Sequence, residues 1–203
     1  MSPPSAHPNP AIHLYLASAS PRRRILLEQI GVRFQTLSLE VPEERQPGES
    51  PEEYALRLAL DKARAGYGHP EHKGSVPVLG ADTVVVLDEQ VLEKPRDHND
   101  ALAMLAALSG RQHEVLSAVA LVNKKEKVVL NKTRVWFRET SVAEREAYWH
   151  TGEPKDKAGA YGIQGMAAVF IEKIEGSFSG VMGLPLFETA SLLKEFDIKI
   201  LGS

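Results

Sequence analysis

The sequence contains no cysteine among its 203 residues. This absence excludes disulfide bonds, thiolate zinc sites and cysteine nucleophiles, and it is typical of proteins in a reducing compartment. No run of apolar residues approaches the length of about 18 that a membrane-spanning helix needs. The proline-rich start, MSPPSAHPNPAIH, lacks the basic and then apolar order of a secretory signal. We therefore expect a soluble, cytoplasmic protein that does not bind membranes.

An excess of one charge is also missing, because 24 Lys and Arg stand against 27 Asp and Glu, for a formal net charge of -3. Without a global basic field, no nucleic-acid partner is expected. The seven histidines have no metal-ligand spacing, and there is no Walker motif, Rossmann fingerprint or nucleophile elbow. What remains is an ordinary globular composition, 43% hydrophobic and 25% charged.

Strand and helix patterns alternate along the chain, which predicts an α/β fold with a mixed central sheet flanked by helices. Short apolar runs between turn residues predict strands over 12–17, 32–39, 76–87, 91–92, 115–123, 127–137 and 167–174. Capping residues before periodic apolar positions predict helices over 21–31, 50–66, 97–109, 141–151 and 185–196. The segment 176–185, GSFSGVMGLP, is expected to be a loop. Residues 1–11 are expected to be a disordered extension before a single domain, 12–203.

The stretch LASASPRRR, residues 16–24, places two serines and three arginines where the first strand ends and the first helix begins. A helix N-terminus exposes unpaired N–H groups and a partial positive charge, so it attracts anions. Arginines there oppose the helix dipole, but a single guanidinium can bind two oxygens of a phosphate at once. We predict phosphate binding by Ser18, Ser20, Arg22 and Arg23. The alternative is a solvated basic first turn.

Asp82 lies within an otherwise apolar strand, GADTVVV. Burying an unpaired carboxylate is costly, so Asp82 should meet a cation, a metal or a proton. A turn cap or a pair with a buried basic group is the structural alternative. The segment Glu93-Lys94-Pro95 follows the short return strand, which brings Lys94 near the same end of the sheet.

Lys62 lies four residues after Leu58 and three before Ala65, so it projects from the apolar face of its helix. Such a lysine commonly extends its amine to solvent, and less commonly points it into an anionic site. Glu43 and Glu44 lie in a polar loop, where glutamates are usually solvated. A triphosphate bound with Mg²⁺ would favour such oxygen ligands.

The segment 156–165, DKAGAYGIQG, has three glycines within seven residues. Glycines allow close approach of the backbone to a ligand, although a plain flexible loop has the same pattern. Gln164 offers both a donor and an acceptor to the edge of a nucleotide base.

Together these motifs resemble the Maf family of nucleoside triphosphate pyrophosphatases. The matching segments occur in the family's order from about Leu14 to Leu193, nearly the whole chain. They are LASASPRRRILLEQIGVRF, ESPEEYALRLALDKARA, VLGADTVVVLDEQVLEKPRD, LSGRQHEVLSAVAL, KAGAYGIQG and GSFSGVMGLPL. That combination is far more specific than any single motif.

The resemblance implies hydrolysis of the α–β phosphoanhydride of a non-canonical or pyrimidine nucleoside triphosphate to the monophosphate and pyrophosphate. It implies a divalent cation, Mg²⁺ or alternatively Mn²⁺ or Co²⁺. It also implies two lobes around a cleft, in a fold related to the inosine triphosphate pyrophosphatases and often found as a homodimer.

For individual residues, the resemblance implies that Asp82 is the general base and that Glu43 and Asp82 associate with the metal. The phosphate-binding cations of the family fall on Arg22, Arg23, Lys62 and Lys94.

The family branch that acts on dTTP and UTP carries SPRR, ADT and YGIQG, whereas the 7-methyl-GTP branch carries SPWR, SDQ and FKSEG. This sequence has the first set, so the specificity positions fall on Arg23, Thr83 and Gln164. The leading hypothesis is a dTTP/UTP pyrophosphatase. The alternatives are a preference for modified pyrimidine triphosphates such as 5-methyl-UTP, a 7-methyl-GTP pyrophosphatase, or a nucleotide-binding regulator of cell division with little turnover. The presence of both Asp82 and Glu43 favours an enzyme, because a pure binder needs no base.

Overall fold

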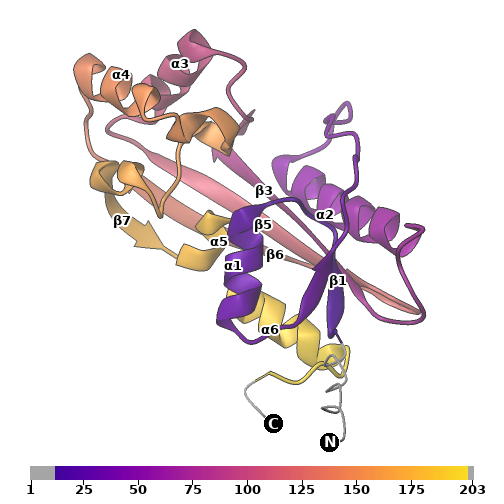
Figure 1. Ribbon diagram of the computed structural model, residues 1–203. Helices are drawn as coiled ribbons and strands as arrows, with labels where there is room; N and C mark the ends of the chain where they lie inside the picture. Colours follow the sequence, from indigo (N-terminus) through magenta and orange to yellow (C-terminus); the bar gives the residue numbers. More distant parts are fainter. Residues whose placement is uncertain (1–11, 201–203) are drawn as a thin grey trace, which may run out of the picture.

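The computed structural model describes residues 12–200 and has a mixed sheet flanked by helices, as the sequence predicts (Figure 1). The sheet order is β2-β1-β3-β5-β6-β7. Strand β4 lies outside this order and pairs with the same edge of β3 as β1 does, but at residues 85–87, whereas β1 pairs with residues 78–79. The β1–β2 and β1–β3 pairs are parallel, and the remaining pairs are antiparallel. The strands are β1 (Leu14–Leu16), β2 (Phe34–Thr36), β3 (Val78–Leu87), β4 (Gln90–Leu92), β5 (Gln112–Val122), β6 (Glu126–Phe137) and β7 (Ile171–Glu175).

Five of the six α-helices in residues 12–200 begin directly after the capping positions that the sequence predicts. None of the described helices is long and apolar enough to cross a membrane. Ser50 and Ser141 each form a capping box with a glutamate three residues later. The α-helices are α1 (Pro21–Gln29), α2 (Pro51–Tyr67), α3 (His98–Leu108), α4 (Val142–His150), α5 (Phe178–Met182) and α6 (Leu186–Glu195). The 3₁₀ helices within residues 12–200 are η1 (Glu153–Asp156), η2 (Ala158–Ala160) and η3 (Met166–Phe170).

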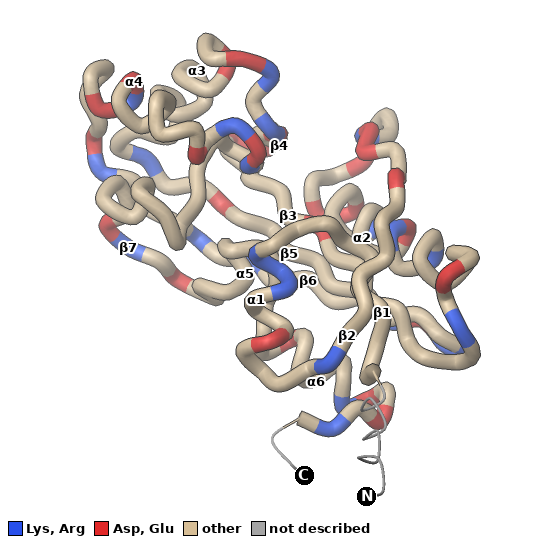
Figure 2. Tube along the Cα trace, in the orientation of Figure 1, with Lys and Arg blue, Asp and Glu red and all other residues tan. Residues whose placement is uncertain are grey.

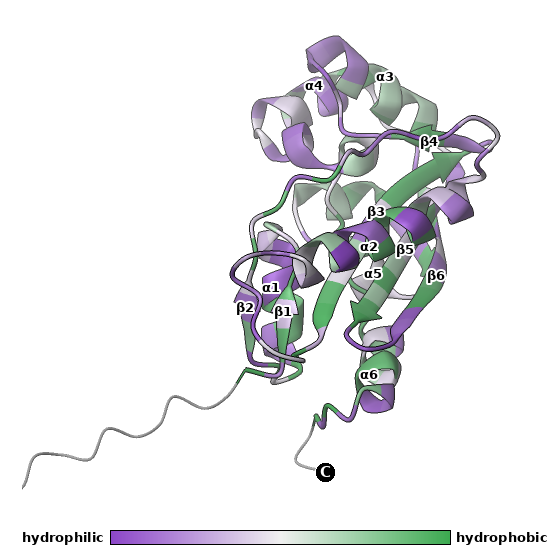
Figure 3. Ribbon diagram, turned by 90° about the vertical axis from the view of Figure 1, so that its right-hand side faces the viewer, coloured by the Kyte–Doolittle hydropathy of each residue, from purple (hydrophilic) through white to green (hydrophobic). Residues whose placement is uncertain are grey.

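The alternation of side chains along β3 assigns the helices to the two faces of the sheet. Val84 and Val86 are buried with the apolar face of α2. Leu79 and Ala81, which point the other way, are buried with α1 and α6. Figure 3 shows β3 and β5 mostly green, in agreement with a core centred on these strands.

The elements form two lobes around the long central strands, as the family resemblance implies. In Figure 1, α3, α4 and β7 lie at one end of the sheet, while α2, β1 and α6 lie at the other. The first end has its own apolar cluster, to which β3 contributes Val85 and Leu87 and β6 contributes Phe137.

Two predicted segments differ from the structure. The apolar run 167–174 predicts a strand, but its first part is η3 and the strand is β7. The reason is spacing: Ala167 and Phe170 are the buried residues of η3, and residues three apart lie on one side of a 3₁₀ helix. The segment 176–185 predicts a loop but contains α5, which Ser177 caps by accepting a hydrogen bond from the Gly180 N–H. The predicted extension, residues 1–11, lies outside the described residues, and the single domain from residue 12 stays a prediction.

The edge of β3 that faces β1 is paired at both ends and open in the middle. β1 pairs with Val78 and Leu79, and β4 pairs with residues 85–87. In the described chain, no strand pairs with this edge over residues 80–84. Asp82 and Thr83 lie in this open part and, as neighbours in a strand, point to opposite faces of the sheet.

Gly80 lets α2 pack directly on β3 next to Asp82. A Cβ added at Gly80 would lie 2.3 Å from the carbonyl oxygen of Ala59 and 2.5 Å from the amide nitrogen of Ala63. Both are backbone atoms of α2, so a side chain here would push the helix away from the strand. The glycine therefore sets the distance from Lys62, the residue before Ala63, to Asp82.

We predict that Gly80→Ala destabilises the protein by about 1–3 kcal/mol, the usual cost of overpacking a core. Chemical denaturation would measure this cost. The matched control is Gly68→Ala at the end of α2, where φ is -82° and the nearest atom to an added Cβ is 3.7 Å away. Equal stability of the two variants would contradict the role given to Gly80.

Candidate active site

A cleft of about 720 Å³ opens over the unpaired part of β3. Its walls are the segment 17–23, the loop 39–43, α2 and the residues that follow β4. A smaller cavity of about 90 Å³ adjoins it and reaches the glycine-rich segment at Gly162 and Gln164. The two cavities share Ser20, Arg22 and Thr83 as lining residues, so they adjoin each other, and together they are called the depression.

The arginine run lies at the start of α1, where Figure 2 shows it as a blue stretch. Ser20 caps the helix and Pro21 occupies its first position. Arg23 donates a hydrogen bond to the hydroxyl of Ser18 at 3.1 Å and another to the carbonyl oxygen of Gly183 at 2.9 Å. These contacts hold the Arg23 guanidinium between the segment after β1 and the residue after α5, at the wall of the cleft.

The electrostatics of Arg23 reflect its place beside the acidic residues. Burial lowers the pKa of the Arg23 guanidinium, while the charges of Asp82 and Glu43 oppose that shift and the charge of Arg22 adds to it. Arg22 itself reaches across the cleft to the carboxylate of Asp156 at 3.4 Å. The two arginines thus approach the cleft from one helix turn but have different partners.

Lys62 bridges two carboxylates. Its ammonium nitrogen lies 2.7 Å from Oδ1 of Asp82 and 2.5 Å from Oε1 of Glu43. Asp82 is only 6% exposed. Of the partners expected for its charge, a cation, a metal or a proton, the structure shows a cation, so the pair with a basic group that the sequence leaves open is present. Lys94 lies 3.6 Å from the second carboxylate oxygen of Glu43. Partial burial acts to raise the pKa of Glu43, but the hydrogen bond and charge of Lys62, with those of Lys94, outweigh it and lower the pKa.

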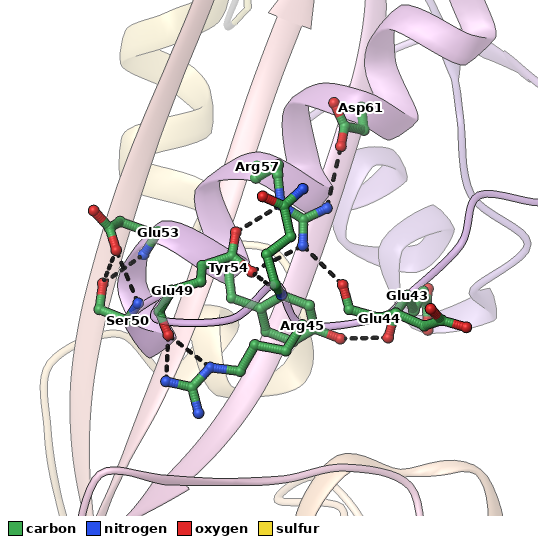
Figure 4. A network of polar contacts seen from close by, with 10 residues as sticks. Glu43, Glu44, Arg45, Glu49, Ser50, Glu53, Tyr54, Arg57 and Asp61 are labelled. Carbon is green, nitrogen blue, oxygen red and sulfur yellow. Dashed lines mark hydrogen bonds and ion pairs between the residues drawn. The ribbon is translucent and has the colours of Figure 1, made fainter.

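The loop that carries Glu43 is fastened to α2 by a network drawn in Figure 4. The Tyr54 hydroxyl donates to the carbonyl oxygen of Glu43 at 2.7 Å, and Arg57 donates to the carbonyl oxygen of Glu44 at 2.9 Å. Arg57 also binds both carboxylate oxygens of Glu49, at 2.6 and 2.9 Å. Burial raises the pKa of Tyr54 to about 12, so its hydroxyl stays protonated as a donor.

Tyr54 and Arg57 were not among the candidates that the sequence suggests. Residues three apart lie on one side of a helix, so the spacing indicates that both side chains contact the same neighbouring segment. The spacing does not indicate which segment this is. The structure shows that the neighbour is the loop 43–49, which both residues bind through backbone carbonyl oxygens and Arg57 also binds through the Glu49 side chain.

Thr83 faces the smaller cavity on the side of the sheet opposite to Asp82. Its hydroxyl accepts a hydrogen bond from Ser117 at 3.1 Å and lies 3.4 Å from the carbonyl oxygen of Gly183. Gln164 is exposed at the rim of this cavity. The cavity that holds these two residues therefore adjoins the part of β3 that carries Asp82.

All of the predicted site residues line the depression, although they come from six separate segments. They are Ser18, Ser20, Arg22, Arg23, Glu43, Lys62, Asp82, Thr83, Lys94 and Gln164. Within residues 12–200, no group of three or more His, Asp or Glu side chains is arranged to hold a metal ion. The arrangement is a cluster of cations around two carboxylates, which suits a polyanionic ligand.

A family model described as "Maf-like protein" matches residues 13–196. The chain belongs to the Maf-like family. It is 57% identical over 190 residues to a dTTP/UTP pyrophosphatase of Alkalilimnicola ehrlichii, covering 92% of this chain and 94% of the relative. A dTTP/UTP pyrophosphatase of Saccharophagus degradans is 54% identical over 189 residues, covering 92% and 90%.

Among solved structures, a nucleoside-triphosphatase (dITP/XTP pyrophosphatase) of Mycobacterium abscessus matches at 22% identity and a TM-score of 0.39. That match covers 61% of this Maf-like chain and 73% of the other. A likeness of this size adds nothing to the description of the site.

We predict that Lys62→Met raises the pKa of Glu43. Partial burial raises this pKa, and in the variant only Lys94 remains to lower it. Carboxyl-carbon NMR titration of Glu43 would measure the change. A folded-state pKa below the ordinary value means that Glu43 contributes stability above that value and loses it as the pH falls through the folded pKa. In Lys62→Met the folded pKa lies closer to the ordinary value, so this loss is smaller and is complete at a higher pH. The control is the exposed Lys73→Met, and an unchanged Glu43 titration in Lys62→Met would contradict the assignment.

Proposed function

We propose that this chain hydrolyses dTTP and UTP to the nucleoside monophosphate and pyrophosphate. The observation that carries the proposal is the convergence of four cations, Arg22, Arg23, Lys62 and Lys94, on a cleft floored by Asp82. The names of relatives that are 54–57% identical over nine-tenths of the chain support the same activity.

The triphosphate is expected to lie along the cations and over the N-terminus of α1, where backbone N–H groups and the helix dipole attract anions. The base is expected to enter the smaller cavity at Thr83 and Gln164. Because Thr83 follows Asp82 directly in β3, the phosphate nearest to the nucleoside, the α-phosphate, then lies closest to Asp82.

Asp82 is the proposed general base. Its carboxylate takes a proton from a water molecule whose oxygen attacks the α-phosphorus, the bond from that phosphorus to the bridging oxygen breaks, and pyrophosphate leaves. The cations stabilise the negative charge that gathers on the departing oxygen and on the phosphoryl group. Lys62 holds the Asp82 carboxylate in place from α2.

A divalent cation fits the donor set at this site. Mg²⁺ is usually held by one or two carboxylates together with substrate phosphates, and Glu43 and Asp82 offer two carboxylates that share one ammonium. When bound, the cation would neutralise phosphate charge. Mg²⁺, with Mn²⁺ or Co²⁺ as alternatives, therefore stays our expectation, as do a homodimer and a cytoplasmic location.

Base choice is proposed to rest on Gln164. Uracil and thymine present an N3–H donor beside carbonyl acceptors, which a carboxamide can complement. A purine leaves buried polar groups unpaired in the same place, at roughly 1–3 kcal/mol each. The same reasoning admits modified pyrimidines that differ at C5, such as 5-methyl-UTP.

We predict that Asp82→Asn lowers kcat by about 10²–10⁴-fold, because asparagine keeps the volume but accepts no proton. Pyrophosphate release from UTP and dTTP with Mg²⁺, Mn²⁺ or no metal would measure it. The matched control is Asp88→Asn, in the exposed turn after β3, where the carboxylate pairs with Arg111. Near wild-type turnover by Asp82→Asn would refute the proposed base. A fully active enzyme without divalent metal would refute the proposed cation.

We predict that Arg22→Ala weakens the binding of every nucleoside triphosphate, since Arg22 contacts phosphate and not the base. A charge-assisted hydrogen bond is worth about 1.5–3 kcal/mol, so KM should rise by tenfold or more. Steady-state kinetics with UTP, dTTP and GTP would test this. Arg24→Ala is the control, because Arg24 is exposed in the same turn and lines neither cavity. Unchanged kinetics in Arg22→Ala would contradict phosphate binding by Arg22 and would favour the alternative, in which the arginine run is a solvated first turn of α1.

A further inference from the structure

The residue proposed to read the base, Gln164, lies in a tight turn. The N–H of Gly165 donates to the carbonyl oxygen of Gly162 at 3.0 Å, which closes a four-residue turn with Gln164 in its third position. The backbone at Gly162 is buried, while the Gln164 side chain is exposed at the small cavity. The direction of the Gln164 amide therefore depends on what holds the two ends of this turn.

One pair of side chains holds both ends. At the start of the turn, the N–H of Gly162 donates to the Tyr148 hydroxyl oxygen at 3.2 Å. Just past its end, the N–H of Met166 donates to Oε2 of Glu153 at 2.9 Å. The Tyr148 hydroxyl in turn donates to Oε1 of Glu153 at 2.7 Å, so the two anchors are joined to each other. Tyr148 comes from α4 and Glu153 from η1, outside the glycine-rich segment.

The glycines of the turn fit this pair closely. A Cβ added at Gly165 would lie 2.3 Å from both carboxylate oxygens of Glu153. A Cβ added at Gly162 would lie 2.8 Å from the side chain of Lys157. The glycines thus allow the turn to lie flat against the Glu153 carboxylate, and ligand approach is not needed to explain them.

The buried setting keeps Tyr148 in the donor form. Tyr148 is 3% exposed. Burial raises the pKa of its hydroxyl, and the hydrogen bond to Glu153 raises it further, so the proton stays between the two side chains at neutral pH. Hydrogen bonds to a carboxylate are stronger than those between neutral groups, which makes Glu153 the firmer of the two anchors.

We propose that Tyr148 and Glu153 are positioning residues for base selection: they fix the turn 162–165 so that Gln164 faces the base. The proposal rests on the proposed function, because it assigns a cause to the pyrimidine preference of the same site. Neither residue lines the two cavities of the site, so both act through the turn.

The kinetic test compares Glu153→Ala and Tyr148→Phe with the wild-type protein on UTP and GTP. We expect the ratio of kcat/KM for UTP to that for GTP to fall roughly tenfold, which corresponds to losing a hydrogen bond to the base. The loss should lie in the KM for UTP, with kcat changed little. Tyr148→Phe keeps the packed ring, so it carries the test if Glu153→Ala does not fold. Glu146→Ala is the control, because Glu146 lies on α4 and pairs with His98 at 2.8 Å, away from the turn.

Amide hydrogen exchange supplies a readout that does not depend on activity. We expect faster exchange over residues 160–170 in both variants, with β5 unchanged. An unchanged UTP to GTP ratio, or an equal loss for both nucleotides, would overturn the proposal. A wild-type protein without preference for UTP would overturn the proposed function and the selectivity role together. A preference that both variants keep would overturn this inference alone.

Discussion

The contact on which the site depends is the double ion pair of Lys62 with Asp82 and Glu43. Asp82 is nearly inaccessible, and a buried carboxylate without a partner is strongly destabilising. Lys62 removes that penalty and at the same time joins three parts of the chain that are far apart in sequence: β3, α2 and the loop after β2. In the proposed reaction, the same ammonium faces the triphosphate. The proposed function thus makes a stabilising contact of the free protein part of the substrate site as well.

The sheet provides the place for this ion pair. Because β1 and β4 pair with different parts of one edge of β3, the residues between them have no strand beside them. That open edge lets the carboxylate of Asp82 and the hydroxyl of Thr83, on opposite faces of one strand, border the same depression. The proposed placement of phosphate chemistry on one face and of base recognition on the other follows from the period of two residues in a strand.

Much of this arrangement could be predicted from the sequence, because it is encoded locally. Serine caps and glutamates three residues later locate α2 and α4, and the charge of Asp82 within an apolar strand predicts a cation, a metal or a proton nearby. The contacts of Tyr54, Arg57 and Glu153 could not be predicted, because each binds backbone groups of a loop whose path depends on tertiary structure. The 3₁₀ helix η3 and the short helix α5 were missed for a related reason. Their few apolar residues fit a strand or a loop equally well until the neighbouring surface is known.

The most direct test of the central claim is the position at which water attacks the substrate. Hydrolysis of UTP in H₂¹⁸O, followed by mass spectrometry of both products, distinguishes the phosphorus atoms. The proposed mechanism places the α-phosphorus beside Asp82, which predicts one ¹⁸O atom in UMP and none in pyrophosphate. Label in the pyrophosphate, or release of orthophosphate in its place, would contradict the assignment of Asp82 and of the cleft around it.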